Sequence, residues 1–199
     1  MGFLSGVLNI KRFFIENTDF FKDRESVVAN LTNFIFKNIE NSSSEESIGW
    51  VNPMKPCGTE IKANDIFFSN YIFLAMRHDV KKVSPLFLDL KVNQLIEKED
   101  LEIKSNRDLK QLKEDVKNDL LKRSLPSSKI VDAVIDIKRS ILLINSSSLK
   151  TCSLFLSLFE KTFAILPIFV DKTVFAHIST GSDGVKKLSE LNETVIYDE

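Results

Sequence analysis

The stretch that decides the fold runs from Ile130 to Asn145 and reads IVDAVIDIKRSILLIN. Two segments rich in β-branched and aliphatic residues, Ile130–Ile137 and Ile141–Asn145, flank a short polar link at Lys138-Arg139. Such segments on either side of a two-residue link are typical of a β-hairpin. The pattern therefore predicts two adjacent antiparallel strands.

Segments on both sides of this hairpin predict further strands and helices. Strands are expected within Phe3–Phe14, over Ile66–Met76 before a polar turn at Arg77 to Asp79, and at Leu166–Val170. Helices are expected after the N-cap Asp23 and between the serines at 146–148 and Thr162. The sequence thus predicts an α+β fold with a largely antiparallel sheet core and packed helices.

The segment between Ser84 and Pro126 has a different pattern. Ser84-Pro85 is typical of a helix start, and a second start is expected at Ser105 or Asn106. Each helix carries one apolar stripe on an otherwise charged surface, which is typical of a projecting helical hairpin. We therefore predict a single unit over 1–199, with a sheet core at about 1–80 and 128–199 and a helical finger at about 84–126.

The charge balance limits the interactions that the surface can make. The chain has 27 basic and 28 acidic residues and a net charge of −1, so only a local basic patch is expected. On the second helix of the finger, Lys110, Lys113 and Lys117 fall within about 60° of one another beside the apolar stripe. Such lysines either keep the helix soluble by lying along the stripe or contact an anionic partner. Lys122-Arg123 meets the negative end of the helix dipole.

No catalytic residues, metal centre or cofactor are predicted. Neither His78 nor His177 has a Cys, Asp or Glu at a convincing ligand spacing, and the sequence contains no glycine-rich phosphate loop. Asp132 and Asp136 share one face of a strand roughly 13 Å apart, too far to hold one metal ion, and are expected to face solvent.

The sequence also predicts where the protein works. Cys57 and Cys152 match no disulfide or metal spacing, which is typical of a reduced, cytosolic protein. The basic pair Lys11-Arg12 follows the first apolar run, whereas an export signal has its positive charge first. A soluble, cytoplasmic protein without membrane contact is expected.

One short motif resembles a known family. Gly49-Trp50-Val51-x-Pro53-Met54 is similar to the G-W-V-x-P-M signature of the RdgC family, bacterial recombination-associated proteins. The resemblance continues in family order, from Ile48 to Val170, and includes Leu109-Lys110-x-x-Lys113-x-Asp115-Val116 and Leu166-Pro167-Ile168. It implies that Trp50, Pro53 and Met54 are structural anchors that pin a strand to the sheet. A lone indole suits this role because its large apolar area carries one N–H that needs a partner.

The resemblance also implies a function. RdgC proteins are known as ring-shaped dimers that bind double-stranded DNA without sequence preference and restrain the RecA recombinase. The partners implied are therefore duplex DNA, a second copy of the chain and a RecA-type recombinase, in association with the nucleoid. The expected phosphate contacts are Lys110, Lys113, Lys117, Lys122 and Arg123, which would act by releasing counterions.

The chain departs from the family pattern at two places. The family sequence L-L-P-R-A-F-S-R at the finger tip appears as LLKRSLPS at 120–127, so Leu121 and Leu125 are the expected dimer contact there. Family members also continue beyond the position of Tyr197, so a shortened member is expected. Two alternatives stay open: a metal-dependent nuclease, suggested by the triplets Glu60-Ile61-Lys62 and Glu102-Ile103-Lys104, and an interaction module that has lost DNA binding.

Overall fold

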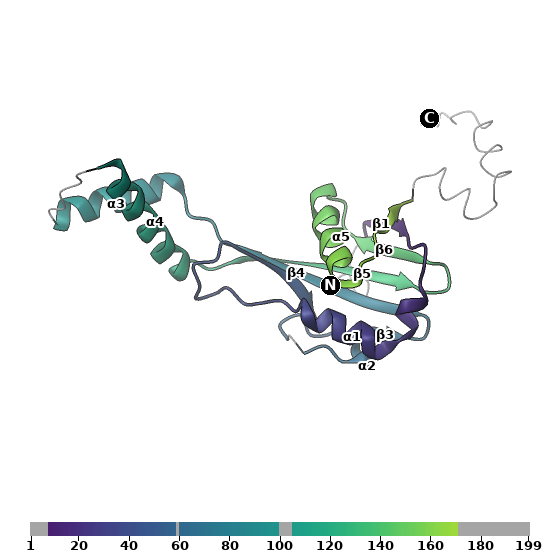
Figure 1. The fold of residues 1–199 in the computed structure, drawn as a ribbon. Coiled ribbons are helices and arrows are strands. Elements are labelled where there is room, and N and C mark those ends of the chain that lie inside the picture. Colours follow the sequence, from purple (N-terminus) through teal and green to yellow (C-terminus); the bar gives the residue numbers. More distant parts are fainter. Residues whose placement is uncertain (1–7, 59, 100–104, 171–199) are drawn as a thin grey trace, which may run out of the picture.

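The fold is built on one antiparallel sheet. A computed structural model describes residues 8–58, 60–99 and 105–170 (Figure 1). The strands run in the order β2-β4-β5-β6-β1-β7, and β3 pairs with the beginning of β4. Their bounds are β1 (Ile10–Phe14), β2 (Glu46–Val51), β3 (Phe67–Phe68), β4 (Tyr71–Val80), β5 (Ser127–Asp136), β6 (Ile141–Asn145) and β7 (Ile168–Phe169).

The helices fall into two groups. A short 3-10 helix η1 (Asp19–Lys22) and the helices α1 (Arg24–Asn33), α2 (Ala63–Ile66) and α5 (Leu149–Phe163) belong to the sheet body. The finger consists of α3 (Pro85–Glu99) and α4 (Asn106–Arg123), inside the expected range 84–126. Helices packed on an antiparallel sheet confirm the predicted α+β class.

Local sequence signals place most of the helix ends where they were predicted. The carboxylate of Asp23 accepts hydrogen bonds from the backbone N–H groups of Glu25 and Ser26, as an N-cap does. Ser105 caps α4 and Ser148 caps α5 in the same way. These side chains supply acceptors for N–H groups that have no partner within the helix.

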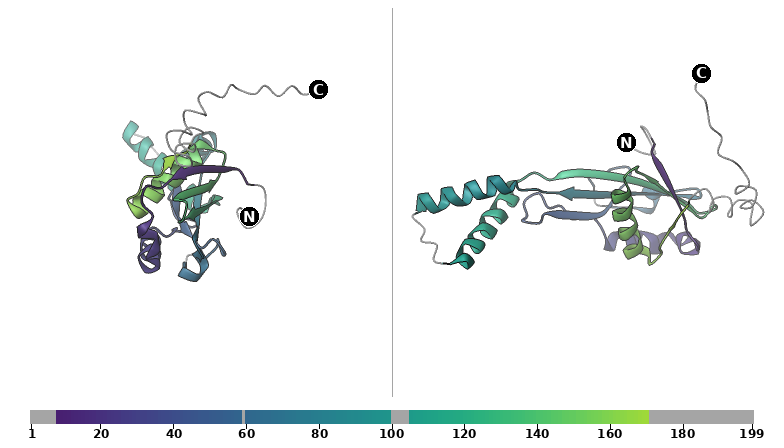
Figure 2. Two further views of the ribbon diagram at one scale, coloured as in Figure 1. Left: turned by 90° about the vertical axis from the view of Figure 1, so that its right-hand side faces the viewer. Right: turned by 90° about the horizontal axis from the view of Figure 1, so that it is seen from above.

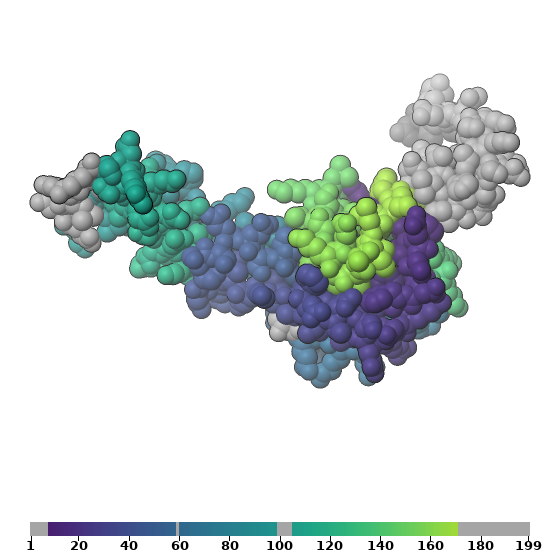
Figure 3. All heavy atoms as spheres, viewed as in Figure 1, coloured from purple at the N-terminus to yellow at the C-terminus, as the bar shows by residue number. Residues whose placement is uncertain are grey.

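The finger is an insertion into a hairpin of the sheet. β4 and β5 pair antiparallel over their whole length, from Tyr71 opposite Asp136 to Val80 opposite Ser127. The chain leaves the sheet at Val80, forms α3 and α4, and returns at Ser127. The finger consequently extends away from the body of the molecule (Figures 1 and 3).

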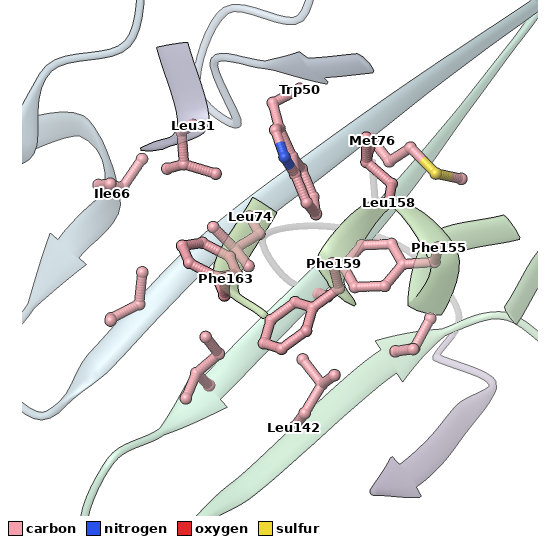
Figure 4. Close-up of a cluster of buried hydrophobic side chains, with 14 of the residues drawn as sticks. Leu31, Trp50, Ile66, Leu74, Met76, Leu142, Phe155, Leu158, Phe159 and Phe163 are labelled. Atoms are coloured by element: carbon pink, nitrogen blue, oxygen red, sulfur yellow. The ribbon is translucent and has the colours of Figure 1, made fainter. Parts of the chain in front are cut away.

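The main core lies between the sheet and the helices α1 and α5, which cover the same face of the sheet (Figure 2). Trp50 of β2 meets Phe155 of α5 with ring centroids 5.3 Å apart in an edge-to-face arrangement. Figure 4 shows the Trp50 ring near Phe155, Phe159 and Phe163 and near the side chains of the central strands. Each such aromatic pair adds about 0.5–1.5 kcal/mol beyond its buried area.

The motif around Trp50 is structural. The indole is fully buried and donates a 2.8 Å hydrogen bond from Nε1 to Oγ1 of Thr162. Gly49 lets the segment at 34–36 lie against β2, because a Cβ there would be 2.4 Å from Cα of Phe36. By contrast, Pro53 is half-buried and Met54 is 39% exposed, in the turn that follows β2.

The anchoring after Trp50 comes from Asn52 instead of Met54. Asn52 is only 4% exposed. Its side-chain amide donates to the backbone carbonyl of Glu60 at 3.0 Å and to the carboxylate of Asp65 at 2.8 Å. Asn52 thereby ties the end of β2 to the segment at 60–65, which precedes β3 and includes part of α2.

Two turn predictions are wrong. Arg77 to Asp79 is not a turn but part of β4, because β2 and β5 pair with it on either side. The guanidinium of Arg77 bonds both oxygens of the Asp79 carboxylate, at 2.9 and 2.7 Å, so the strand can bury that charge. The link between β5 and β6 spans four residues, 137–140, because Asp136 pairs with Ile141.

The first and last strands are shorter than expected. β1 begins at Ile10, and residues 3–7 of the predicted strand lie outside the described residues. β7 covers only Ile168 and Phe169, and it pairs with β1.

Candidate nucleic-acid interface

The base of the finger is held by a buried lysine. Lys81 follows β4 directly and is only 2% exposed. Its ammonium group donates to three backbone carbonyls: Glu40 at 2.6 Å, Ser42 at 3.1 Å and Leu121 at 2.8 Å. Three donors meet three acceptors, which offsets the large cost of removing a charge from water. Lys81 thus joins the loop at 39–45 to the end of α4.

The carbonyl of Leu121 is a favourable partner for this charge. The last carbonyls of a helix lack partners within the helix and form the negative end of its dipole. The carbonyl of Leu121 accepts the N–H of Ser124 at 3.2 Å, and the ammonium group of Lys81 adds a second hydrogen bond at a position where the dipole stabilises it. Sequence analysis missed Lys81 because a lysine next to Lys82 has no local signal that distinguishes it from a surface charge.

The lysine stripe of α4 is partly engaged within the chain. Lys113 pairs with Asp89 of α3 at 2.7 Å, and Lys117 pairs with Glu45 of the loop at 39–45. Both lysine side chains keep 43% of their surface exposed. Lys110 is exposed and forms no ion pair with the described residues. Exposed ion pairs contribute only about 0–1 kcal/mol, so a phosphate group can compete with these carboxylates.

The residues expected at the finger tip lie at its base. α4 runs from the tip back to the sheet, so its last turn is next to β5. Leu121 is 1% exposed and buried in the base, whereas Leu125 is 80% exposed just after the helix. Lys122 and Arg123 are both exposed, and Arg123 pairs with Asp119 at 2.8 Å. The predicted placement at the tip is wrong because the end of α3 and the start of α4 form the far end of the finger, and α4 ends beside the sheet.

A groove opens between the finger base and α5. It has a volume of about 960 Å³, and its walls include Lys82, Lys129, Lys150, Leu125 and Leu154. Lys82 comes from the segment that links β4 to the finger, Lys129 from β5, and Lys150 from the first turn of α5. Because these lysines are far apart in the sequence, only the folded sheet brings them together.

The two acidic residues of the groove, Glu45 and Glu46, have basic partners. Glu45 pairs with Lys117, and Glu46 is 2.6 Å from Nε2 of His78. The ammonium group of Lys129 donates to the hydroxyl of Thr151 at 2.9 Å, which fixes its position in the wall. The N-terminal turn of α5 borders the groove and adds the positive end of its dipole. The electrostatic character of the groove is therefore basic.

The two carboxylates on β5 are less exposed than expected, and only Asp136 is buried. Asp136 is 6% exposed and accepts hydrogen bonds from the backbone N–H and the guanidinium of Arg139. Asp132 is half-buried on the sheet face opposite α1 and α5, and burial raises its pKa. Within the described part of the chain, no three His, Cys, Asp or Glu residues gather into a possible metal site.

The remaining sequence expectations concern thiols and membrane contact. Cys57 is exposed and Cys152 is buried, and neither forms a disulfide. Burial raises the pKa of the Cys152 thiol. None of the helices in the described ranges is both long and apolar enough to cross a membrane.

Comparison with known proteins agrees with the short motif around Trp50. Residues 9–179 match the family model described as "Putative exonuclease, RdgC". A search of curated proteins found no match. Since the match extends over most of the 199 residues, the chain belongs to the RdgC family.

Proposed function

We propose that this protein binds double-stranded DNA without sequence preference, through the base of its finger. The observation that carries this proposal is the basic groove, in which Lys82 after β4, Lys129 of β5 and Lys150 of α5 meet. Phosphates in the groove would displace counterions, which gives affinity that depends on salt and not on base sequence.

The finger extends this surface. Lys110 and Lys122 are exposed on α4, and Arg123 lies beside Lys122 at the base. Lys113 would exchange its carboxylate partner Asp89 for a phosphate, a change that costs little because the ion pair is exposed to solvent. Lys117 would approach the phosphates with its exposed surface while it stays paired with Glu45. The finger thus supplies secondary contacts, whereas the groove supplies the main one.

The same proposal includes a second copy of the chain. Leu125 is the most exposed large apolar side chain at the finger base, beside the groove. A homodimer that covers Leu125 would place two grooves on one duplex and could thereby modulate RecA-type recombination or replication in the nucleoid. The resemblance of this chain to RdgC proteins supports this part of the proposal.

Fluorescence anisotropy with two unrelated duplexes at several salt concentrations tests the proposal. A dimer that neutralises about six phosphates should lose on the order of a thousandfold in affinity between 50 and 200 mM salt. Combining Lys82→Gln, Lys129→Gln and Lys150→Gln should reduce the slope of log affinity against log salt by about 0.9 for each phosphate that is no longer neutralised. The matched control carries Lys55→Gln, Lys62→Gln and Lys161→Gln, which are exposed lysines outside the groove.

Two results would contradict the proposal at different levels. Equal salt slopes for the groove variant and the control would remove the groove from the DNA contact. If the unmodified protein fails to bind duplex DNA even at 50 mM salt, the binding function itself is refuted. Self-association that persists in that case would favour the interaction module.

A nuclease is the second candidate, because the matched family carries an exonuclease description. The measurement is the degradation of linear duplex DNA by the pure protein with Mg²⁺ or Mn²⁺. Loss of DNA that requires the metal and scales with protein concentration would favour this candidate. Intact DNA under the conditions of duplex binding would leave binding as the function.

A further inference from the structure

A second pocket lies at the end of the sheet far from the finger. The start of α1, the turn between β3 and β4, and the loop between β5 and β6 surround a space of about 490 Å³. These segments lie opposite the finger in Figures 1 and 2. The volume is within the usual range of roughly 300–1,000 Å³ for small-molecule sites.

Every charged residue among the described residues that line this pocket is basic. These basic residues are Lys22, Arg24 and Lys138, and none of the 28 acidic residues of the chain is among the described lining residues. Lys22 pairs with Asp19, but both side chains are exposed, so the pair is easily exchanged. The guanidinium of Arg24 lies 5.2 Å from the centre of the Phe67 ring. That contact orients the guanidinium without neutralising it.

Neutral hydrogen-bonding groups complete the lining. They are the hydroxyls of Thr18, Ser69 and Ser140 and the side-chain amide of Asn70. Ser69 and Ser140 have φ angles of 56° and 57°, and Ala164 is the one other non-glycine residue with positive φ in the described ranges. Residues other than glycine rarely adopt a positive φ, and those that do tend to cluster at ligand-binding turns.

The backbone holds these turns in place. The N–H of Ile137 donates to the carbonyl of Asn70 at 3.0 Å, which joins the loop after β5 to the turn after β3. The N–H of Ile15 donates to the carbonyl of Ser140 at 2.8 Å. The loops around the pocket are therefore arranged before any ligand arrives, which reduces the entropy lost on binding.

We propose that this pocket binds a terminal phosphate group or a short polyphosphate. Such a group carries two or more negative charges and several acceptor oxygens, which match the three cations and the neutral donors Ser69, Asn70 and Ser140. The hydroxyl of Thr18 instead donates to the backbone carbonyl of Ile137 at 3.3 Å. Arg24 offers a planar guanidinium suited to two parallel hydrogen bonds with phosphate oxygens. The pocket is separate from the groove at the finger base, so this inference does not depend on duplex binding there.

Calorimetric titration of the full chain with inorganic pyrophosphate and with AMP tests the site. Arg24→Gln and Lys138→Gln should each weaken binding about tenfold or more, because each removes a charged hydrogen bond. Lys55→Gln, an exposed lysine outside the pocket, should leave binding unchanged. Both pocket residues are exposed, and thermal melts should show that their variants fold.

A comparison of duplexes with a 5′-phosphate and a 5′-hydroxyl identifies the source of the phosphate. If the phosphorylated duplex binds more tightly and Arg24→Gln removes the difference, the ligand is a strand end. If AMP or pyrophosphate binds and the two duplexes bind equally, the ligand is a soluble phosphate compound. The proposal is wrong if pyrophosphate and AMP both fail to bind and the 5′-phosphate makes no difference to duplex binding. It is also wrong if Lys55→Gln weakens binding as much as Arg24→Gln does.

The small-anion titration also separates this proposal from the proposed function. Pyrophosphate and AMP need no duplex surface, so their binding would survive a failure of duplex binding at the groove. Conversely, duplex binding that responds to the groove lysines, with no binding of small anions and no preference for a 5′-phosphate, would retain the groove and remove this pocket.

Discussion

The sheet body and the finger are held in place by different forces. The body has one large aromatic cluster around Trp50, which both α1 and α5 cover. The finger buries few apolar residues, among them Val92, Val116 and Leu121, and Lys81 joins it to the body. Burial of apolar area therefore stabilises the body, whereas a few directional hydrogen bonds set the direction of the finger.

Truncation of Trp50 should have the largest effect and should act on the body. Trp50→Ala removes a fully buried ring and leaves the Thr162 hydroxyl without its donor. We expect a loss of about 3–5 kcal/mol in the free energy of unfolding, measured by urea denaturation. Trp50→Phe should lose less because it keeps part of the packing against Phe155. A loss below about 1 kcal/mol for Trp50→Ala would show that the aromatic cluster does not dominate the body.

Replacement of Lys81 should act on the finger and leave the body intact. Lys81→Met keeps much of the side-chain volume but leaves three carbonyls without their donor. We expect a local loss of about 1–3 kcal/mol, since water reaches part of the freed carbonyls. Hydrogen exchange should quicken in α4 and in the loop at 39–45, and much less in β5 and β6.

The matched control for this variant is Lys82→Met, at the neighbouring exposed position. Its hydrogen exchange should remain close to that of the unmodified protein. Uniformly faster exchange across the sheet in Lys81→Met would mean that the body and the finger unfold together. The comparison between the two regions would then be wrong.

The smallest effect should come from Asp132, on the sheet face opposite α1 and α5. Burial raises the pKa of this carboxyl in the folded protein, so the folded state favours the protonated form. The stability gained from protonation is fully present below the unfolded pKa and is lost as pH rises through the folded pKa. Asp132→Asn should therefore stabilise the protein at pH 7 but not at pH 3.

Solvent screening limits this gain to about 0.5 kcal/mol, because Asp132 is only half-buried. Thermal melts at the two pH values measure it. A variant that is less stable at pH 7 would show that the charged carboxylate makes a favourable contact on this face.

Much of the fold could be predicted because its signals are local. The serine and aspartate caps satisfy N–H groups within their own first turn, so Asp23, Ser105 and Ser148 are recognisable from neighbouring residues alone. The strand at Arg77 to Asp79 could not be predicted in this way. Its charges are tolerated because Arg77 and Asp79 pair between two neighbouring strands, and the sequence does not reveal those neighbours.

The candidate site was less predictable than the fold. The stripe on α4 could be found because helical periodicity brings Lys113 and Lys117 together, but their carboxylate partners come from other segments. The groove lysines come from three separate segments of the chain, so no sequence spacing relates them. The position of Leu121 at the base follows from the direction of α4, which only the folded hairpin defines.

The point of insertion of the finger has a structural consequence. Val80 and Ser127 face each other in the sheet, so the chain enters and leaves the finger at positions about 5 Å apart. Strand ends that are this close can be joined by a tight turn or by a long insertion without a shift of either strand. The length and sequence of the finger can therefore change without any change in the strands or in the aromatic core of the body.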